Sequence, residues 1–434
     1  MKLLHANDAP GKYPQSWYAA TAHDLPEFAP LKSDERANVC VIGAGYTGLS
    51  AALHLAKKGH RVILLEAQRV GFGASGRNGG QLGSGQRQDQ EALIKMVGAE
   101  DARKLWLLGE EAKQVTKGLI EKHNIHCDLK PGVAWAASSP REAQHMLDYA
   151  VLLEREYGYD QIECFDHEGF DALCPSPVYR GGILDMGAGH LHPLNYALGL
   201  ARACRDAGVQ IYERSEVIDV ADGSPAIVRT IGGLVRAENV ILATNGYLGG
   251  LNRKVAARVM PINNFIAATE PLGTETARVL ARDIAVADDK FVVNYFRLSA
   301  DGRLLFGGGE SYGYRFPADI AAKVRKPMAD IFPHLSDVRI DYAWGGTLAI
   351  TMKRLPHFAR LSQNILSASG YSGHGVGTAT HAGMLMAQAV AGRSDGFDTM
   401  SRLPTPAFPG GAGLRSPLLV LAMTWFALRD RLGI

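Results

Sequence analysis

A glycine fingerprint near the N-terminus constrains the fold more than any other feature of the sequence. Residues 38–42 (NVCVI) form a short apolar run rich in β-branched residues, which predicts a buried parallel strand. The run leads into GAGYTG, in which Gly43, Gly45 and Gly48 are spaced as G-x-G-x-x-G, and then into an apolar helical pattern. A second strand is predicted at once in residues 61–66 (RVILLE). This order predicts an α/β fold with a parallel sheet and a dinucleotide site.

The three glycines and Glu66 each have a predicted task. Gly43 allows a tight turn, Gly45 lets a pyrophosphate approach the backbone, and Gly48 lets helix and strand pack closely. The start of the helix offers free N–H groups and a positive dipole end to a phosphate. Glu66, eighteen residues beyond Gly48, can accept hydrogen bonds from a ribose hydroxyl. We therefore expect an ADP-containing dinucleotide; the alternative is an ordinary α/β unit with a glycine turn.

The segment after Glu66 distinguishes FAD from NAD. Residues 71–85 read GFGASGRNGGQLGSG, with seven glycines in fifteen positions, where an NAD-binding domain would continue into another strand and helix. The segment has little helix or strand propensity, so we expect an irregular backbone whose amides face a flat or anionic group. An extended FAD fits this description. We expect Arg77 and Asn78 to fix the loop and Gln81 to hydrogen-bond to the flavin.

Two later segments predict further cofactor contacts. Residues 238–249 (ENVILATNGYLG) predict a strand that runs into a turn at Thr244, Asn245 and Gly246, like the second FAD-contacting element of flavoproteins with two dinucleotide-binding domains. Upstream, a helix that begins at Pro193 is followed by a predicted strand through Val217. Val217 is a candidate for an adenine contact and equally for plain core packing.

A third glycine loop precedes the last long helical pattern. Residues 365–392 predict a strand, the loop GYSGHGV and a helix that starts near Val376. The free N–H groups and positive dipole of that helix would stabilise the negative charge of a reduced flavin. His374 is a candidate base, and equally a loop residue that exposes its backbone. The residues expected to contact FAD are Gly43, Gly45, Tyr46, Thr47, Gly48, Glu66, Ala74, Ser75, Arg77, Asn78, Gly79, Gly80, Gln81, Val217, Thr244, Asn245, Gly246, Gly370, Gly373, Gly375 and Val376.

Bulk properties exclude several classes of protein. At 434 residues the chain favours two or three domains, and 47% apolar with 21% charged residues is typical of a globular protein. A net charge of +2 argues against nucleic-acid binding. Five cysteines without C-x-x-C spacing favour a reducing cytoplasm, and neither they nor the HLH at residues 190–192 suggest a metal site. We expect no membrane span, and a packed helix in residues 416–434, with membrane-surface attachment as the alternative.

These motifs together resemble the FAD-dependent D-amino acid oxidase and sarcosine oxidase superfamily. The resemblance covers nearly the whole chain and rests on VCVIGAGYTGLSAALHLA, RVGFGASGRNGGQL, GAGHLHPLN, RLSADGRLLFGGG, GYSGHGV and the ending LRDRLGI. It implies a Rossmann-like FAD domain and an α+β substrate domain built on an antiparallel sheet. The expected FAD domain comprises residues 1–90, 166–251 and 342–434, and the expected substrate domain comprises residues 91–165 and 252–341.

The resemblance also implies a reaction. Its nearest branch oxidises a primary amine, γ-glutamylputrescine or a related γ-glutamylated polyamine, to an imine and then an aldehyde in polyamine catabolism. Ammonia and hydrogen peroxide are released, so the partners are a small amine and molecular oxygen. The alternatives are a dehydrogenase of sarcosine, glycine or D-amino acids that passes electrons to a carrier, and a flavin-binding subunit of a hetero-oligomer.

Two departures from better-known relatives bear on the site. Some relatives bind flavin covalently through a histidine or cysteine in the segments that read SGRNGGQ and GTLAITMKRLP here, and neither residue is present. We therefore expect noncovalent FAD. A lysine that binds the substrate carboxylate in sarcosine-oxidising relatives is replaced by Gly377, which argues against a small α-amino acid.

The resemblance places three further residues near the substrate. Arg297 would lie near the flavin face, where it could bind an anionic part of the substrate or favour oxygen reduction. A surface ion pair between Arg297 and Asp301 is the alternative. Tyr342 and Trp344 could wall the substrate pocket, although at least one is expected to be ordinary core. No protein base is required if the substrate binds as the free amine.

Overall fold

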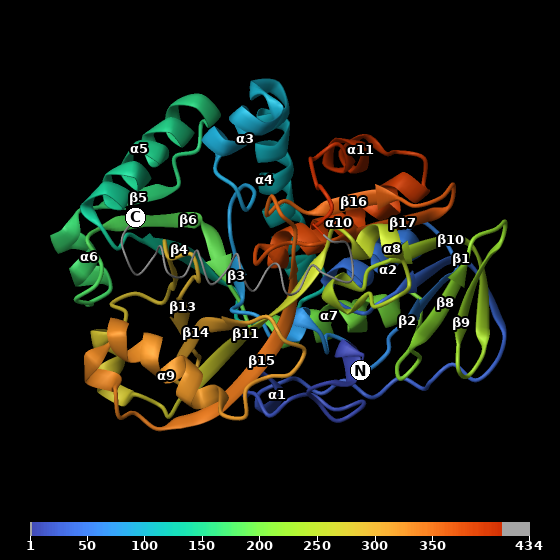
Figure 1. Ribbon diagram of the computed structural model, residues 1–434, viewed down its shortest axis with the longest axis horizontal. Coiled ribbons are helices and arrows are strands. Elements are labelled where there is room, and N and C mark those ends of the chain that lie inside the picture. The colour runs from blue at the N-terminus through green and yellow to red at the C-terminus, as the bar shows by residue number, and fades with distance from the viewer. Residues whose placement is uncertain (1, 410–434) are drawn as a thin grey trace.

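The computed structural model describes residues 2–409 and contains two β-sheets that lie side by side (Figure 1). The first sheet and its helices occupy the right of the view, and the second sheet occupies the left with α5 and α9. This confirms the expected α/β fold class. The helix expected in residues 416–434 lies outside the described residues.

The first sheet has the strand order β16-β17-β10-β1-β2-β7, in which the five strands from β17 to β7 are parallel. The edge strand β16 is antiparallel to β17, and a hairpin of β8 and β9 joins β10. The central strands consist of consecutive apolar residues because both faces of the sheet are buried: Val39, Val41, Val62 and Leu64 lie in one core, and Cys40, Ile42, Ile63 and Leu65 lie in a second core on the other face. The strands are β1 (Glu35–Ile42), β2 (Val62–Leu65), β7 (Gln210–Tyr212), β8 (Val217–Ala221), β9 (Ala226–Thr230), β10 (Leu234–Leu242), β16 (His357–Arg360) and β17 (Ile365–Ser369).

Three helices pack against the first sheet and against one another. They are α2 (Tyr46–Ala56), α7 (Pro193–Asp206) and α10 (Gly375–Val390). Gly383 permits the close approach of α10 to α2, because a Cβ atom there would lie 2.3 Å from the Thr47 carbonyl oxygen. The helix α7 begins at Pro193, as predicted, and the His192 side chain accepts a hydrogen bond from the Asn195 N–H at 3.1 Å.

The second sheet has the strand order β15-β11-β14-β13-β12-β4-β6-β3, and β5 pairs with β6. Its pairs are antiparallel except for β12 with β4. One face packs on α9 (Ile320–Ile331), with Phe265, Phe296 and Phe306 in the shared core. The strands are β3 (Gln81–Leu82), β4 (Lys130–Ala136), β5 (Ile162–Phe165), β6 (Gly182–His190), β11 (Met260–Thr269), β12 (Ala285–Asp288), β13 (Tyr295–Leu298), β14 (Leu304–Ser311) and β15 (Ile340–Ile350).

The remaining helices are short except for α4 and α5, which lie at the top of Figure 1. The α-helices are α1 (Trp17–Ala20), α3 (Gln90–Val97), α4 (Ala99–Lys122), α5 (Pro140–Tyr157), α6 (His167–Leu173), α8 (Arg253–Ala256) and α11 (Asp395–Ser401). The 3-10 helices are η1 (Leu3–His5), η2 (Ala74–Gly76), η3 (Asn245–Tyr247), η4 (Gly273–Arg278) and η5 (Pro333–Leu335).

Strand pairing crosses the expected domain boundaries in two places. β6 lies in the segment 166–251, expected in the FAD domain, but it pairs with β4 in the second sheet. β15 lies mostly in the segment 342–434, yet it pairs with β11. In addition, α4 packs on α10 of the first sheet. The division into two domains remains a prediction, and these elements are where the chain crosses between the sheets.

The chain after α7 forms two strands rather than the single expected strand through Val217. β7 pairs with β2, and β8 begins at Val217 and pairs with β9. Between them Arg214 has a φ of 50°, in the left-handed region, and the buried Glu213 carboxylate accepts a hydrogen bond from the Val70 N–H at 2.8 Å. These contacts draw the backbone out of the sheet.

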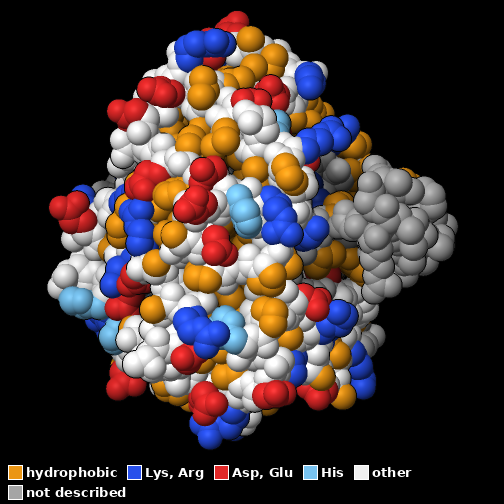
Figure 2. Space-filling model, turned by 90° about the vertical axis from the view of Figure 1, so that its left-hand side faces the viewer, with side chains coloured by type: hydrophobic (Ala, Val, Ile, Leu, Met, Phe, Trp, Pro, Cys, Tyr) orange, Lys and Arg blue, Asp and Glu red, His pale blue; other side chains and the backbone are white. Residues whose placement is uncertain are grey.

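The surface beside the second sheet carries basic and acidic side chains in an interspersed pattern, which agrees with the small net charge (Figure 2). Within residues 2–409 no group of three or more histidine, cysteine or acidic side chains is arranged to hold a metal ion. In the same range no helix is long and apolar enough to cross a membrane. All five cysteines are free thiols.

Candidate active site

A cavity of about 940 Å³ extends between the two sheets. This volume lies near the upper end of the roughly 300–1,000 Å³ typical of small-molecule sites. The wall includes the turn after β1, the end of β2 and the turn after β10, together with side chains of β4, β12 and β13. Most residues predicted to contact FAD line it, namely Gly43, Gly45, Tyr46, Thr47, Glu66, Ala74, Ser75, Arg77, Asn78, Gly79, Gln81, Val217, Thr244, Asn245, Gly246, Gly373, Gly375 and Val376.

The glycine turn after β1 has the geometry that the fingerprint predicts. Gly43 has a φ of 103°, and a Cβ atom there would lie 2.7 Å from the Ala243 carbonyl oxygen. At Gly45 a Cβ atom would lie 2.8 Å from the Ser75 hydroxyl oxygen. At Gly48 it would lie 1.8 Å from the Gly43 carbonyl oxygen, because helix and strand are in contact there. A side chain at any of the three positions would change the turn.

Glu66 follows directly after β2 and lies in the cavity wall. Its carboxylate accepts hydrogen bonds from the Ala44 N–H at 2.7 Å and the Gln68 N–H at 2.8 Å. Burial raises the pKa of Glu66 to about 7, although these backbone N–H groups act in the opposite direction. Glu66 is therefore a hydrogen-bond acceptor placed at the strand end, where a ribose would lie.

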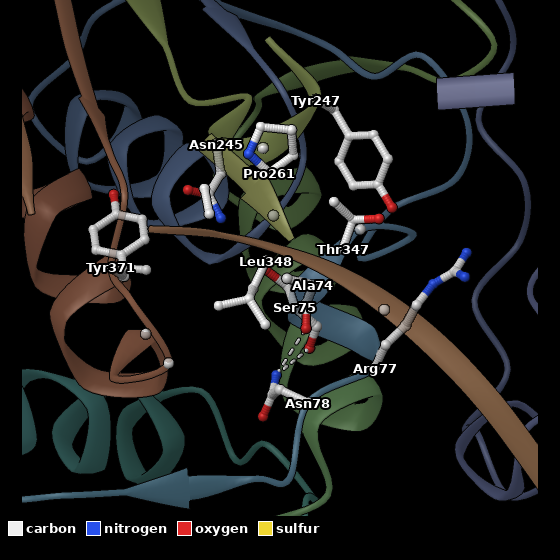
Figure 3. Close-up of a pocket in the computed structure, with 18 of the residues that line it drawn as sticks. Ala74, Ser75, Arg77, Asn78, Asn245, Tyr247, Pro261, Thr347, Leu348 and Tyr371 are labelled. Atoms are coloured by element: carbon white, nitrogen blue, oxygen red, sulfur yellow. Dashed lines mark hydrogen bonds between the residues drawn. The ribbon is translucent and has the colours of Figure 1, made fainter. Parts of the chain in front are cut away.

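Arg77 holds the glycine-rich loop from behind. Its guanidinium donates hydrogen bonds to the Phe72 carbonyl at 2.7 Å and the Gly345 carbonyl at 3.1 Å, and it forms an ion pair with Asp8 at 2.8 Å. Figure 3 shows the side chain of Arg77 directed away from the labelled residues around the cavity. Arg77 therefore ties the loop to β15 and to the N-terminal segment.

Asn78 closes the loop on itself. Its side-chain amide donates to the carbonyls of Ala74 at 3.0 Å and Ser75 at 3.1 Å (Figure 3). Its carbonyl oxygen accepts from the Gly80 N–H at 2.7 Å. The predicted loop-fixing role of Arg77 and Asn78 thus has a direct basis in hydrogen bonds. Gln81 instead donates to the Val286 carbonyl at 2.8 Å, and a flavin contact by Gln81 remains a prediction.

The turn after β10 meets the third glycine loop. Asn245 has a φ of 45°, and its side-chain oxygen accepts a hydrogen bond from the Gly370 N–H at 2.9 Å. Tyr371 lies on the same side of the cavity (Figure 3), and its hydroxyl is 2.7 Å from the Thr47 hydroxyl. These contacts join the turn after β10, the third glycine loop and the start of α2 around one cavity.

The N-terminus of α10 opens into the cavity at His374, Gly375 and Val376. The His374 ring packs on Gly83, where a Cβ atom would lie 2.7 Å from ring carbon Cε1. Burial, with a smaller contribution from the nearby Arg87 guanidinium, lowers the pKa of His374 to about 4. The ring is therefore neutral at physiological pH, and the helix dipole supplies the local positive potential.

The residues present fit FAD. The Thr244 side-chain oxygen lines the cavity and is buried without a hydrogen-bond partner among the described residues, so it offers an unused polar group to a ligand. The Cβ contacts at Gly43 and Gly45 leave a backbone surface that a pyrophosphate can approach. Glu66 and the N-terminus of α10 supply an acceptor and an anion-binding group.

Three of the predicted cofactor residues lie outside the cavity wall. Gly48 packs against Gly43, as described above. Gly80 has a φ of 80°, and a Cβ atom there would lie 2.1 Å from the Leu191 carbonyl oxygen. Gly370 has a φ of 77° and lies against Thr351. These glycines shape the backbone of the loops rather than the wall of the cavity.

The structure corrects both expectations for Arg297, which does not belong to the cavity wall. Its buried guanidinium donates hydrogen bonds to the carbonyls of Gly79 at 3.1 Å, Leu191 at 3.1 Å and Leu298 at 3.3 Å. It is therefore neither a substrate ligand nor a surface arginine paired with Asp301. Strand β13 places the Arg297 guanidinium next to the glycine-rich loop. Its N–H groups therefore donate to three backbone carbonyl oxygens rather than to a ligand.

Tyr342 and Trp344 do not wall the cavity either. Trp344 is buried in the core, where its indole N–H donates to the Arg77 carbonyl at 3.1 Å and its ring meets Tyr18 edge to face. Tyr342 lies beneath the guanidinium of Arg303, 5.6 Å from the ring centroid. Neither side chain is free to wall the cavity, because Trp344 is packed in the core and Tyr342 lies against Arg303.

Other side chains form the wall that the sequence left unidentified. Tyr295 and Trp135 line the cavity from the second sheet, and the Tyr295 hydroxyl donates to the Asn264 side-chain oxygen at 2.5 Å. The Tyr295 ring lies between Gly79 and Gly307, where Cβ atoms would lie 2.6 and 2.1 Å from ring atoms. The signal in the sequence that could have identified Tyr295 was the presence of glycines, including Gly79 and Gly307, in the segments that pack on its ring. Three charged residues, Arg87, Glu310 and Arg354, also line the cavity, and no sequence motif identified them.

Comparison with known proteins agrees with this geometry. Residues 38–389 match the model of the DAO family, described as FAD dependent oxidoreductase. The chain is 41% identical over 426 residues to gamma-glutamylputrescine oxidoreductase of Escherichia coli (strain K12), covering 98% of this chain and 100% of that protein. It is also 41% identical over 420 residues to the probable oxidoreductase OrdL of Rhizobium meliloti (strain 1021), covering 96% and 97%.

Solved structures share the fold. Glycine oxidase from Geobacillus kaustophilus superposes with a TM-score of 0.71 at 22% sequence identity, covering 83% of this chain and 95% of that one. L-proline dehydrogenase from P. horikoshii superposes with a TM-score of 0.67 at 20% identity, covering 88% and 96%. At these identities the likeness concerns the fold alone.

Proposed function

The chain belongs to the DAO family of FAD-dependent oxidoreductases, and we propose that it oxidises the primary amine of γ-glutamylputrescine or of a related γ-glutamylated polyamine. The amine becomes an imine, water hydrolyses the imine to an aldehyde and ammonia, and molecular oxygen is reduced to hydrogen peroxide. The observation that carries the proposal is the full-length similarity to the E. coli gamma-glutamylputrescine oxidoreductase. The cavity, which continues from the cofactor cradle beneath the second sheet, supports it.

The first sheet would hold FAD. Glu66 would accept hydrogen bonds from the ribose, and the turn at Gly43 and Gly45 would receive the pyrophosphate. Thr244 would donate its free hydroxyl, and the N-terminus of α10 would face the negative end of the flavin. When bound, FAD supplies the hydride acceptor for the carbon next to the amine.

The chain itself must position the reacting C–H bond and exclude water. Trp135 and Tyr295 line the cavity from the second sheet, and the Tyr295 ring contacts Gly79 of the glycine-rich loop. Their rings cover the reacting end of the substrate with apolar surface. The hydrogen bond from the Tyr295 hydroxyl to Asn264 fixes one of the two rings in place.

The amine must also be unprotonated when it reacts. The N-terminus of α10 creates a positive potential at this end of the cavity, which lowers the pKa of a bound ammonium group and favours the neutral amine. With a pKa of about 4, His374 is too weak a base to retain the released proton. We therefore assign the His374 ring a positioning role beside Gly83, with the proton leaving to solvent.

We further propose that FAD is bound without a covalent link, because the segments 75–81 and 346–356 contain neither histidine nor cysteine. Precipitation of the purified holoprotein with acid should leave a colourless pellet and release the flavin to the supernatant. A pellet that stays yellow after washing in denaturant would contradict noncovalent binding.

Anaerobic bleaching of the bound flavin tests the substrate. The panel should contain γ-glutamylputrescine, putrescine, sarcosine, glycine and D-alanine, each mixed with the holoprotein in the absence of oxygen. We expect the fastest bleaching with γ-glutamylputrescine and slow or no bleaching with the three amino acids. Preferential bleaching by sarcosine, glycine or D-alanine would reject the proposed substrate. Bleaching by no member of the panel would favour a flavin-binding subunit.

Reoxidation of the bleached enzyme tests the electron acceptor. Mixing with air-saturated buffer in a stopped-flow instrument should restore the flavin absorbance rapidly and release one hydrogen peroxide per amine. Slow reoxidation by oxygen together with fast reoxidation by a quinone would identify a dehydrogenase.

A further inference from the structure

Three charged side chains gather in a part of the cavity to which the FAD proposal assigns no substrate contact. Arg87 lies in the loop after β3, Glu310 near the end of β14, and Arg354 in the turn between β15 and β16. The three segments are far apart in the sequence and converge only through the second sheet. Arg87, Glu310 and Arg354 are hereafter called the charged cluster.

The two arginines of the charged cluster have no fixed anionic partner. Among residues 2–409 neither guanidinium donates a hydrogen bond, and neither lies within the 4.0 Å N···O distance of an ion pair. Arg354 lies over the Phe291 ring, 5.8 Å from its centroid. Burial lowers the pKa of both arginines, because each charge has lost part of its hydration without gaining a close counter-ion.

Glu310 has one oxygen engaged. Its Oε2 atom accepts a hydrogen bond from the Tyr312 hydroxyl at 2.8 Å, and within residues 2–409 its Oε1 atom accepts none. Burial raises the pKa of Glu310, while the hydrogen bond from Tyr312 and, more weakly, the charges of Arg354, Arg87 and Lys323 lower it. The cluster therefore presents two cationic groups and one carboxylate oxygen to the same cavity, none of them satisfied by a short contact.

We propose that the charged cluster binds an α-amino acid head group, with Arg87 and Arg354 on the α-carboxylate and Glu310 on the α-ammonium. This inference rests on the proposed function, because a γ-glutamylated amine carries such a head group at the end opposite its reacting amine. Guanidinium groups bind carboxylates through paired, charge-assisted hydrogen bonds, which a lysine cannot reproduce. The α-ammonium would donate a hydrogen bond to the Oε1 atom of Glu310, which accepts none from the described residues.

The same arrangement disfavours the parent diamine. A free diamine such as putrescine would bring a second ammonium group toward Arg87 and Arg354, where like charges repel in a half-buried site. The γ-glutamyl group replaces that ammonium with a neutral amide and adds the carboxylate that the arginines need. The charged cluster would therefore set specificity in two ways: it attracts the carboxylate of the γ-glutamyl group and repels the second ammonium group of a free diamine.

Three substrates with the same reacting amine distinguish the contact to the α-carboxylate from the contact to the α-ammonium. They are γ-glutamylputrescine, N-glutarylputrescine, which keeps the carboxylate but lacks the α-ammonium, and N-acetylputrescine, which lacks both. Arg87→Gln and Arg354→Gln should each lower kcat/KM about 10- to 100-fold for the first two, mainly through KM, as expected for a lost charged hydrogen bond. Both variants should change kcat/KM for N-acetylputrescine less than about 3-fold.

Glu310→Gln should act on γ-glutamylputrescine alone. Its kcat/KM is expected to fall about 10-fold there and to stay near the wild-type value for N-glutarylputrescine. Lys353→Gln is the matched control: the same charge is removed one residue from Arg354, at an exposed position outside the cavity wall. This control should leave all three substrates unaffected.

A binding measurement keeps the test independent of turnover. γ-Glutamyl-n-butylamide carries the head group without the reacting amine, and its affinity for the holoprotein is read by calorimetry and by the change in flavin absorbance. Arg87→Gln and Arg354→Gln should weaken it at least 10-fold. Arg87→Lys and Arg354→Lys serve instead if the glutamine variants lose flavin, and they should weaken binding as well, because lysine lacks the planar fork.

Each outcome decides between the two proposals. Wild-type affinity in the arginine variants, or equal losses for γ-glutamylputrescine and N-acetylputrescine, overturns the head-group site. If the wild-type protein binds γ-glutamyl-n-butylamide, and does so through the arginines, but does not oxidise γ-glutamylputrescine, the head-group site stands and the proposed reaction fails. If the wild-type protein oxidises γ-glutamylputrescine with arginine-independent KM, the reaction stands and the head-group site fails.

Discussion

The Glu66 carboxylate accepts a hydrogen bond from the backbone N–H of Ala44 at 2.7 Å, so the end of β2 and the turn after β1 form one unit. The contact places an acidic group beside the cofactor cavity. Because burial outweighs the backbone hydrogen bonds, the pKa of Glu66 is raised from an ordinary 4.5 to about 7. Its ionisation state therefore changes within the physiological range.

We expect the affinity of the apoprotein for FAD to rise between pH 6 and pH 8. A ribose hydroxyl donates to the ionised carboxylate of Glu66, whereas below about pH 7 the carboxyl is protonated and must first lose its proton. The rise should be about 10-fold, and Glu66→Gln should abolish it. Quenching of FAD fluorescence by the apoprotein measures both. A flat wild-type profile would argue against a role for Glu66 in binding.

The same shift gives a stability prediction for the apoprotein. Between pH 4.5 and about 7 the folded protein holds a proton on Glu66 that the unfolded chain has released. This group therefore makes the free energy of unfolding decrease as pH rises through that window. Urea unfolding of wild-type and Glu66→Gln apoproteins should differ in slope against pH there and run parallel above pH 8.

Gly48→Ala should destabilise the protein by about 3 kcal/mol or more, because its Cβ atom would lie 1.8 Å from a backbone oxygen that cannot move freely. Gly118→Ala in α4 is the control, since a Cβ atom there meets nothing within 4 Å. That change should stabilise by about 0.5–1 kcal/mol through helix propensity. Urea unfolding of both variants checks the pair, and similar effects at the two sites would reject the steric argument.

Arg297→Gln should reduce stability rather than substrate affinity. The variant leaves the carbonyls of Gly79 and Leu191 without their donors, at a cost of about 2–4 kcal/mol. Thermal unfolding should report this loss, while KM for γ-glutamylputrescine should change less than about 3-fold. A KM increase of 10-fold or more with unchanged stability would restore a direct substrate contact for Arg297.

Lys113→Met should be strongly destabilising. Lys113 is buried in α4, and its ammonium lies 2.8 Å from the Glu110 carboxylate, 2.6 Å from the Ser84 hydroxyl and 2.9 Å from the Tyr159 hydroxyl. Removing it leaves an unbalanced carboxylate in the interior, which costs about 3–5 kcal/mol. Lys104→Met on the exposed face of the same helix should have no measurable effect on urea unfolding. Equal stability of the two variants would contradict the prediction.

The sequence by itself determined the cofactor cradle. The glycine spacing from Gly43 to Gly48, the acid at Glu66 and the helix starts at Pro193 and near Val376 can each be recognised from residues close together in the chain. Backbone sterics, proline geometry and the helix dipole act over one or two turns, so consecutive residues reveal them. The prediction of FAD rests on these local constraints.

The tertiary structure alone decided which side chains line the cavity. The resemblance predicts Arg297 near the flavin, and Trp344 is a candidate for the wall of the substrate pocket, but backbone carbonyls accept hydrogen bonds from both side chains in the core. Arg87, Glu310 and Arg354 had no motif, and three distant segments bring them into one cavity. The face that a strand residue presents depends on the register with its neighbours, and burial of a charge depends on residues far away in the chain. Strand register and the burial of a charge therefore cannot be read from consecutive residues of the sequence.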